Sequence, residues 1–226
     1  MTGSTLANPT TCSSTAEKSG CGCEGVAAAF DGASPAYKRV LWIVIALNAA
    51  MFAVEIVAGQ LAGSMALQAD ALDFLGDSLT YGITLAVLGM SLRVRAGAAM
   101  VKGVSLTAMG VYVLGASLWR TFVDGTPEAV TMGVIGAAAL AVNVTAALLL
   151  LRYRDGDANV RSVWLCSRND AIGNVAVLVA AGVVAVTNTK WADLAVAAIM
   201  ASLFLSSSFR IIAQASRELR DAKATA

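Results

Sequence analysis

Six long apolar segments constrain the fold of this chain more than any other feature of its sequence. They run approximately over Val40–Ala62, Met65–Met90, Ala99–Phe122, Ala129–Leu151, Val160–Val186 and Trp191–Ala215. Crossing a bilayer takes about 20 apolar residues, and each segment is long enough to do so. Because the segments are apolar on nearly every face, they do not fit a soluble helical bundle. The sequence therefore predicts an all-α integral membrane protein, with six transmembrane helices in one bundle.

The composition agrees with a chain that lies mostly in lipid. Of the 226 residues, 58% are hydrophobic and only 14% are charged, whereas soluble domains carry about 25% charged residues. The net charge of +1 gives no basic surface for nucleic acid. We therefore expect membrane lipid, and no nucleic acid, among the partners of the chain.

The charged residues outside the apolar segments predict the orientation. We expect residues 1–35 to form a disordered, cysteine-containing leader, residues 36–219 the transmembrane domain and residues 220–226 a short tail. An even number of spans places both termini on one side, and most basic residues fall on that side, including Lys102 near the start of the third segment. Only Arg120 and Lys190 fall on the other side. This asymmetry predicts that both termini are cytoplasmic.

Two of the apolar segments carry pairs of possible metal ligands. Asp73 and Asp77 are four residues apart in the second segment, and Cys166 and Asp170 have the same spacing in the fifth. Residues four apart share one face of a helix. A charge at mid-bilayer costs at least about 2.5–3.5 kcal/mol, so such residues face the bundle interior and mark a pathway. Four converging ligands suit a tetrahedral divalent metal ion, and the chain has no histidine to supply one.

Three further charged residues in the segments leave alternatives open. Asp70 either pairs with Arg168 on a neighbouring helix or takes part in ligation. Glu55 completes a polar network, carries protons or bonds to a neighbouring helix. We expect these residues around the metal site or along a proton path.

The leader contains Cys12, Cys21 and Cys23. In a reducing cytoplasm these thiols stay free, so they are candidates for capturing a soft metal ion. The alternative is a disordered tail with incidental cysteines.

These residues resemble those of the cation diffusion facilitator family of metal–proton antiporters. The second segment reads Ala69-Asp70-Ala71-Leu72-Asp73 and continues to Asp77, as in family members with aspartate in place of histidine. The resemblance extends to further positions, which are Glu55, Gly59, Gly63, Cys166, Asp170, Asn174, Trp191 and Asp193. It implies that Asp73, Asp77, Cys166 and Asp170 bind the metal and that Asn174 lies beside them. It also implies a possible homodimer in a bacterial inner (plasma) membrane.

Two departures from the family pattern affect the expected function. Cys166 stands where the family has histidine, and a soft thiolate favours zinc or cadmium, while the carboxylates keep iron, cobalt and manganese possible. We also expect a variant without the cytoplasmic domain that follows the sixth span in typical members.

We therefore expect a secondary active transporter that exports a divalent metal from the cytoplasm in exchange for protons. The alternatives are a non-transporting membrane metal sensor or chaperone and a proton-coupled exporter of small organic cations. An enzyme is not expected, because without histidine no nucleophile–base pair is evident, and no prosthetic group is expected either. Several small residues would let helices approach closely, namely Gly110, Gly115, Gly133 and Gly136.

Overall fold

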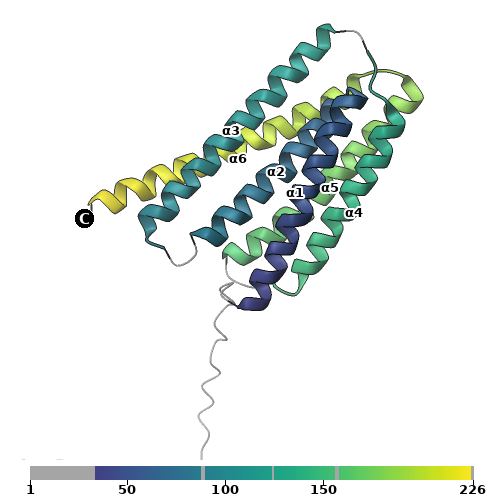
Figure 1. Ribbon diagram of the computed structural model, residues 1–226. Coiled ribbons are helices and arrows are strands. Elements are labelled where there is room, and N and C mark those ends of the chain that lie inside the picture. The colour runs from purple at the N-terminus through teal and green to yellow at the C-terminus, as the bar shows by residue number, and fades with distance from the viewer. Residues whose placement is uncertain (1–33, 88–89, 124, 156–157, 225–226) are drawn as a thin grey trace, which may run out of the picture.

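All regular structure in the described part of the chain is helical. The structure is a computed structural model that describes residues 34–87, 90–123, 125–155 and 158–224. Its helices are α1 (Pro35–Ala62), α2 (Met65–Ala86), α3 (Leu92–Phe122), α4 (Ala129–Leu151), α5 (Ala158–Thr187) and α6 (Trp191–Ala224) (Figure 1). The predicted all-α class and the six helices are thereby confirmed.

The surface of the bundle suits a lipid environment. Five of the six helices are long and apolar enough to cross a membrane, and α2 is the exception. Large apolar side chains such as Leu61, Trp119 and Phe122 are exposed on the outside. Apolar surface exposed on this scale is rare in soluble proteins, whereas lipid chains cover it without cost. The chain is a multi-pass integral membrane protein.

Four helix ends differ from the predicted spans by about one turn or more. α1 begins at Pro35 rather than Val40, α2 ends at Ala86 rather than Met90, α3 begins at Leu92 rather than Ala99, and α6 extends to Ala224 rather than Ala215. Hydropathy marks only the part of a helix that suits hydrocarbon, whereas the hydrogen-bonded helix continues into the aqueous boundary. The added turns contain arginine and glutamate, such as Arg95 and Glu218, which are good helix formers.

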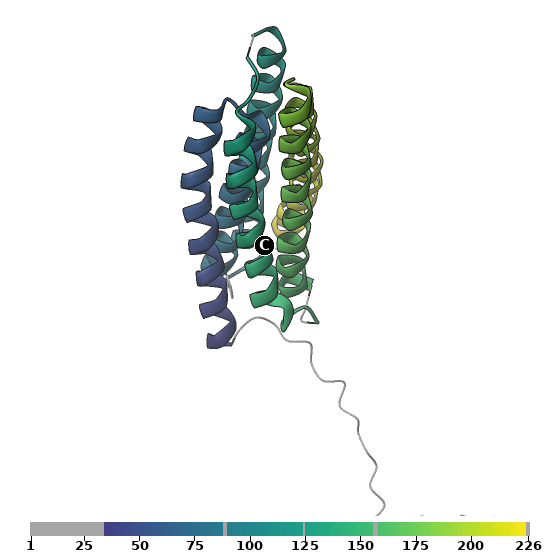
Figure 2. The same cartoon turned by 90° about the vertical axis from the view of Figure 1, so that its right-hand side faces the viewer.

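The helix α2 lies at the centre of the bundle. It packs closely against α1 and also contacts α3, α5 and α6. The remaining helices form two pairs, α4 with α5 and α3 with α6 (Figure 1). In the view turned by 90° the helix axes are roughly aligned (Figure 2), whereas Figure 1 shows α6 crossing α3 at an angle. Because its neighbours shield it from lipid, α2 can carry charged side chains that the outer helices cannot.

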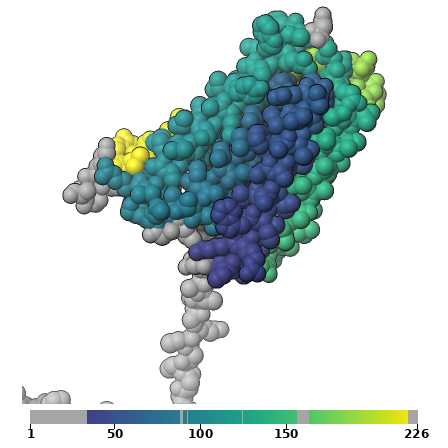
Figure 3. Space-filling model, in the orientation of Figure 1, coloured from purple at the N-terminus to yellow at the C-terminus, as the bar shows by residue number. Residues whose placement is uncertain are grey.

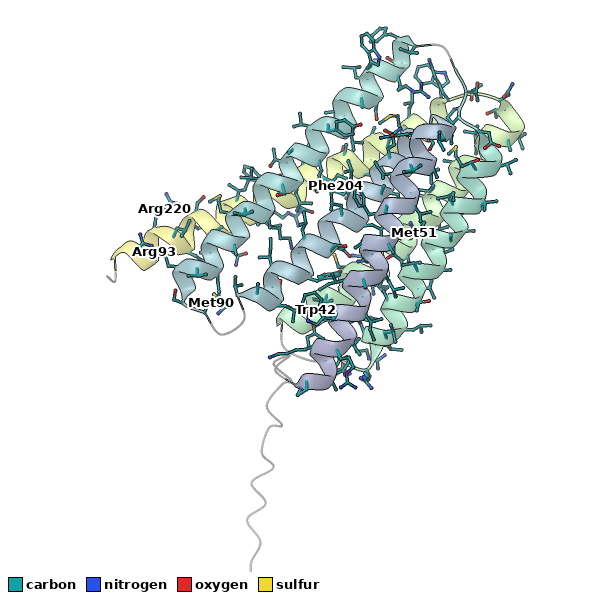
Figure 4. All side chains as sticks on the ribbon, in the orientation of Figure 1. Trp42, Met51, Met90, Arg93, Phe204 and Arg220 are labelled. Atoms are coloured by element: carbon teal, nitrogen blue, oxygen red, sulfur yellow. The ribbon has the colours of Figure 1, made fainter. Side chains whose placement is uncertain are left out.

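The pair α3 and α6 projects beyond the other helices at one end. Figure 3 shows the last turns of α6 beside the beginning of α3, away from α1. Figure 4 shows Arg93 of α3 and Arg220 of α6 at this projecting end. We call the end of the bundle at which α1 begins and α6 ends the terminal end.

The opposite end, which we call the closed end, is formed by Gly63–Ser64 and residues 125–128 and 188–190. Asp193 in the first turn of α6 binds the beginning of α2 there. Its carboxylate accepts hydrogen bonds from the Ser64 hydroxyl (2.5 Å) and from the backbone N–H groups of Met65 (2.8 Å) and Ala66 (3.0 Å). These N–H groups have no partner within α2, so an acidic side chain is a favourable cap at this helix start.

Two basic side chains add to the closed end. The Arg120 guanidinium at the end of α3 donates to the Gly63 carbonyl oxygen. The Lys190 ammonium donates to the carbonyl oxygens of Thr121 (3.1 Å) and Val123 (2.7 Å). Arg120 and Lys190 are the two basic residues that the sequence assigned to this side. They stabilise helix ends that would otherwise leave carbonyl groups unsatisfied.

Close helix approach was predicted at four glycines, and the structure supports two of them. A Cβ atom on Gly110 of α3 would lie 2.9 Å from Leu205 Cγ of α6, and one on Gly136 of α4 would lie 3.4 Å from side-chain atoms of Leu178 in α5. At Gly115 and Gly133 a Cβ atom would meet nothing within 4 Å. The prediction is wrong for these two because their faces point away from the neighbouring helix.

Replacing Gly110 with leucine is expected to destabilise the α3–α6 pair. The added side chain overlaps Leu205, and overpacking of this kind typically costs about 1–3 kcal/mol. The thermal unfolding of the detergent-solubilised protein, followed by tryptophan fluorescence, measures the effect. The matched control is Gly115→Leu on the same helix, which has open space. Equal melting temperatures for the two variants would contradict the packing described here.

Candidate metal site

A cavity of about 350 Å³ lies between α2, α3, α5 and α6. Its apolar walls include Leu106 of α3 and Met200 and Phe204 of α6, and Figure 4 shows Phe204 near the middle of the bundle. The polar residues that line it are Asp73, Asp77, Thr80, Lys102, Cys166, Asn169, Asp170 and Ser207. None of the closed-end residues that the structure describes is among them. The lining extends instead toward the terminal end, to Thr80 of α2 and Ile211 of α6.

The helix α2 presents a column of polar side chains to this region. Asp73, Asp77 and Tyr81 follow one another at intervals of four residues and therefore share one helix face. The Tyr81 hydroxyl donates a hydrogen bond of 2.6 Å to Asp77 Oδ2. Both side chains are buried. The tyrosine thus fixes the Asp77 carboxylate with one oxygen engaged and the other directed elsewhere.

The helix α5 brings Cys166 and Asp170 to the same place. The Cys166 thiol donates a long hydrogen bond of 3.5 Å to Asp77 Oδ1, the oxygen that Tyr81 leaves free. One ligand atom from each of Asp77, Cys166 and Asp170 lies within 4.8 Å of the other two. An ion at the centre of a triangle of this size would lie at most about 2.8 Å from each atom, so binding zinc at about 2.0–2.3 Å needs only a small inward movement of the ligands.

Asp73, the fourth ligand predicted from the sequence, lies beside this group. It lines the same cavity but is not one of the three residues whose ligand atoms meet. The structure therefore gathers three of the predicted ligands around one point and places the fourth on the wall of the same cavity. Asp73 would have to move toward the other three to complete a four-ligand set.

The charge of this cluster is not balanced by a nearby ion pair. Across the described ranges the one ion pair joins Arg154 and Asp155 at 3.4 Å, on the protein surface. One oxygen of Asp170 is buried with no hydrogen-bond partner among the described residues. Buried carboxylates are stable only when paired, protonated or bound to a metal. The cluster is therefore suited to hold a cation or protons.

A second polar network lies behind the cluster, between α1, α2, α4 and α5. The Asn174 amide donates to Asp70 Oδ2 (2.5 Å), and the Asn143 amide donates to Asn174 Oδ1 (2.8 Å). Glu55 of α1 is fully buried, and neither of its carboxyl oxygens has a hydrogen-bond partner among the described residues. A buried carboxyl without a partner is most stable when it is protonated. Asn174, which was predicted to lie beside the metal ligands, contacts Asp70 and Asn143 in this network.

The predicted pair between Asp70 and Arg168 is wrong. Arg168 is exposed, donates to Asn169 Oδ1 (3.2 Å) and lies over the Trp164 ring at 5.4 Å. Positions two apart on a helix point in nearly opposite directions. Since Cys166 faces the bundle interior, Arg168 faces outward. Asp70 accepts a hydrogen bond from the Asn174 amide instead.

Sequence reasoning missed Tyr81, Asn143 and Lys102 as parts of the site. Tyr81 was detectable because it continues the four-residue spacing of Asp73 and Asp77. Asn143 was harder to recognise from the sequence, because it is a single amide side chain in an apolar helix. Lys102 was counted among the basic residues of the cytoplasmic side, whereas the structure places it on the cavity wall.

The structure describes one of the four cysteines. Cys166 is a free thiol that lines the cavity. Cys12, Cys21 and Cys23 lie outside the described residues, so their capture of metal stays a prediction. Oxygen donors combined with one sulfur donor suit a borderline-soft divalent ion better than magnesium or calcium.

Comparison with known proteins identifies relatives of most of the chain. Residues 41–220 match the family described as the Cation efflux transmembrane domain. A protein named cadmium, cobalt and zinc/H(+)-K(+) antiporter from Bacillus velezensis is 27% identical over 190 residues, which is 77% of this chain and 60% of the relative.

Two further relatives have similar coverage. The metal cation efflux system protein CzcD of Cupriavidus metallidurans is 25% identical over 72% of this chain and 55% of its own length. The zinc transporter ZitB of Yersinia pestis is 29% identical over 80% of this chain and 62% of its own length. The chain thus spans about 60% of the length of these curated relatives.

Replacing Tyr81 with phenylalanine is expected to weaken metal binding by about tenfold or more. Removing a hydrogen bond that orients a metal ligand typically costs 10–100-fold in affinity. Competition with a zinc-binding dye measures the dissociation constant of the purified protein. Tyr112→Phe, at an exposed position of α3, makes the same chemical change outside the site. An unchanged affinity for Tyr81→Phe would contradict the role of this hydrogen bond.

Proposed function

This chain belongs to the cation efflux family, and we propose that it exports zinc or cadmium from the cytoplasm in exchange for protons. Membership of the family confirms the resemblance to cation diffusion facilitators. Metal transport by this chain, the choice of metal, the direction and the counter-ion are the parts we propose.

The observation that carries the proposal is the meeting of Asp77, Cys166 and Asp170 inside an apolar bundle. No packing role needs two carboxylates and a thiol at one buried point, and a divalent cation satisfies all three. One sulfur ligand supports zinc or cadmium over harder ions. The names of the relatives, which include cadmium, cobalt and zinc, support the same choice.

The direction of loading follows from the cavity and from the charges at the two ends. The cavity extends from the ligands toward the terminal end, and the basic residues that favour the cytoplasm cluster at that end. An ion entering from the cytoplasm would therefore pass Thr80 and Lys102 before reaching Asp77. We infer that the conformation described here is the one that loads metal in the cytoplasm.

Release on the other side requires the closed end to open. The contacts that seal it are the hydrogen bonds of Asp193 to Ser64 and to the start of α2, together with that of Arg120 to Gly63. They join α6 and α3 to the α1–α2 turn, whereas Lys190 joins the start of α6 to the end of α3. We propose that α3 and α6 move as one pair relative to α2 and α5, so that the contacts with the α1–α2 turn break while the cavity closes toward the cytoplasm.

Proton exchange follows from the chemistry of the ligands. Carboxylates and thiolate bind metal in the deprotonated form, so a metal ion that enters displaces protons and protons that return displace the metal. Both carboxyl oxygens of the buried Glu55 lack a hydrogen-bond partner among the described residues, so this side chain is suited to hold a proton. We propose that Glu55 and Asp70 exchange protons with the ligands and do not bind the metal themselves.

The transport proposal predicts flux that depends on a pH gradient and on Asp77. Full-length protein is reconstituted in liposomes that contain an ion-sensitive dye, and zinc, cadmium, cobalt, iron and manganese are compared. We expect the fastest flux for zinc or cadmium, and a loss of at least about tenfold for Asp77→Asn because a ligand charge is removed.

The matched control is Asp155→Asn, which removes the same charge on the surface and is expected to leave flux unchanged. Zinc binding without flux in any gradient would contradict transport and favour the sensor or chaperone. Flux of small organic cations through the Asp77→Asn variant would contradict the metal site.

A further inference from the structure

Lys102 is a basic side chain on the wall of the cavity that holds the metal ligands. It comes from α3, whereas Asp77 comes from α2 and Cys166 from α5. Among the described residues that line the cavity it is the only basic one. A lysine inside an apolar span is costly and usually marks a functional position with an acidic partner.

The surroundings of Lys102 point to that partner. Its side chain is half-buried and lines the same cavity as Asp77 and Cys166. Within the described ranges it forms no ion pair at 4.0 Å or less. The ammonium is therefore near the ligands without being bound to any one of them. Its flexible four-carbon stem lets the charge approach or retreat.

We propose that Lys102 is a tethered cation that balances the ligand charges when no metal is bound and withdraws when a divalent ion enters. This inference rests on the metal site proposed above. An empty cluster of carboxylates in an apolar bundle repels itself, and a nearby ammonium reduces that repulsion without occupying the coordination position. Lys102 thereby sets the affinity for metal, which determines how readily the ion is released.

The sign of the effect follows from charge alone. A positive ammonium repels a divalent ion held at Asp77, so the lysine lowers the affinity of the site. At an effective dielectric constant of about 20, a unit charge within several ångströms changes the affinity for a divalent ion by at least about tenfold. Removing the charge should strengthen binding, which is the opposite of the usual result of altering a residue in a binding site.

The test measures zinc dissociation constants of the full-length protein by competition with a chelating dye. Cys12, Cys21 and Cys23 are replaced by serine in all samples so that only the cavity site is measured. We expect Lys102→Met to bind zinc about tenfold more tightly or better, and Lys102→Arg to keep the original affinity. Lys38→Met, which removes a lysine charge at an exposed position of α1, should also keep it.

The outcomes separate this inference from the proposed function. Asp77→Asn should weaken binding, and if it does not, the metal site itself is wrong. In a second outcome, Asp77→Asn weakens binding as expected while Lys102→Met leaves the affinity within twofold or also weakens it. That result would overturn the role proposed for Lys102 and leave the metal site standing. Lys102→Gln serves in place of Lys102→Met if the latter has a lowered melting temperature. If Lys102→Arg tightened zinc binding as much as Lys102→Met, the charge of Lys102 would have no role in the affinity.

Discussion

The structure depends on one electrostatic constraint, which is that α2 carries three aspartates and still has to cross an apolar layer. Asp70, Asp73 and Asp77 cannot face lipid, where an unpaired charge is costly. The helix is therefore surrounded, with α1 packed along it and α3, α5 and α6 on its other sides. The apolar outer helices follow from this arrangement, because they supply the lipid-facing surface that α2 does not.

The same constraint divides the aspartates between two environments. Asp70 lies in a polar network, where it accepts a hydrogen bond from the Asn174 amide. Asp73 and Asp77 line the cavity. One helix thus places the proposed proton-holding network and the proposed metal-holding cluster less than two turns apart.

The sequence predicted the parts of the site that repeat with the helical period. The six helices, the pair Asp73 and Asp77, and the pair Cys166 and Asp170 all follow from spacing within one helix. Contacts between helices could not be derived in this way. The assignment of Arg168 to Asp70 was wrong because it relied on the lack of another partner and ignored the face to which Arg168 belongs. Asp193 caps the start of α2 because the α1–α2 turn lies against the first turn of α6. Only the three-dimensional structure reveals this contact.

The most direct test of the account is X-ray absorption spectroscopy of zinc bound to the full-length protein in which Cys12, Cys21 and Cys23 are serine. The account predicts one sulfur at about 2.3 Å from the zinc and oxygen ligands at about 2.0–2.2 Å. It also predicts that the sulfur signal disappears when Cys166 is replaced by serine. A zinc ion surrounded by oxygen alone, while Cys166 is intact, would contradict a site built from Asp73, Asp77, Cys166 and Asp170.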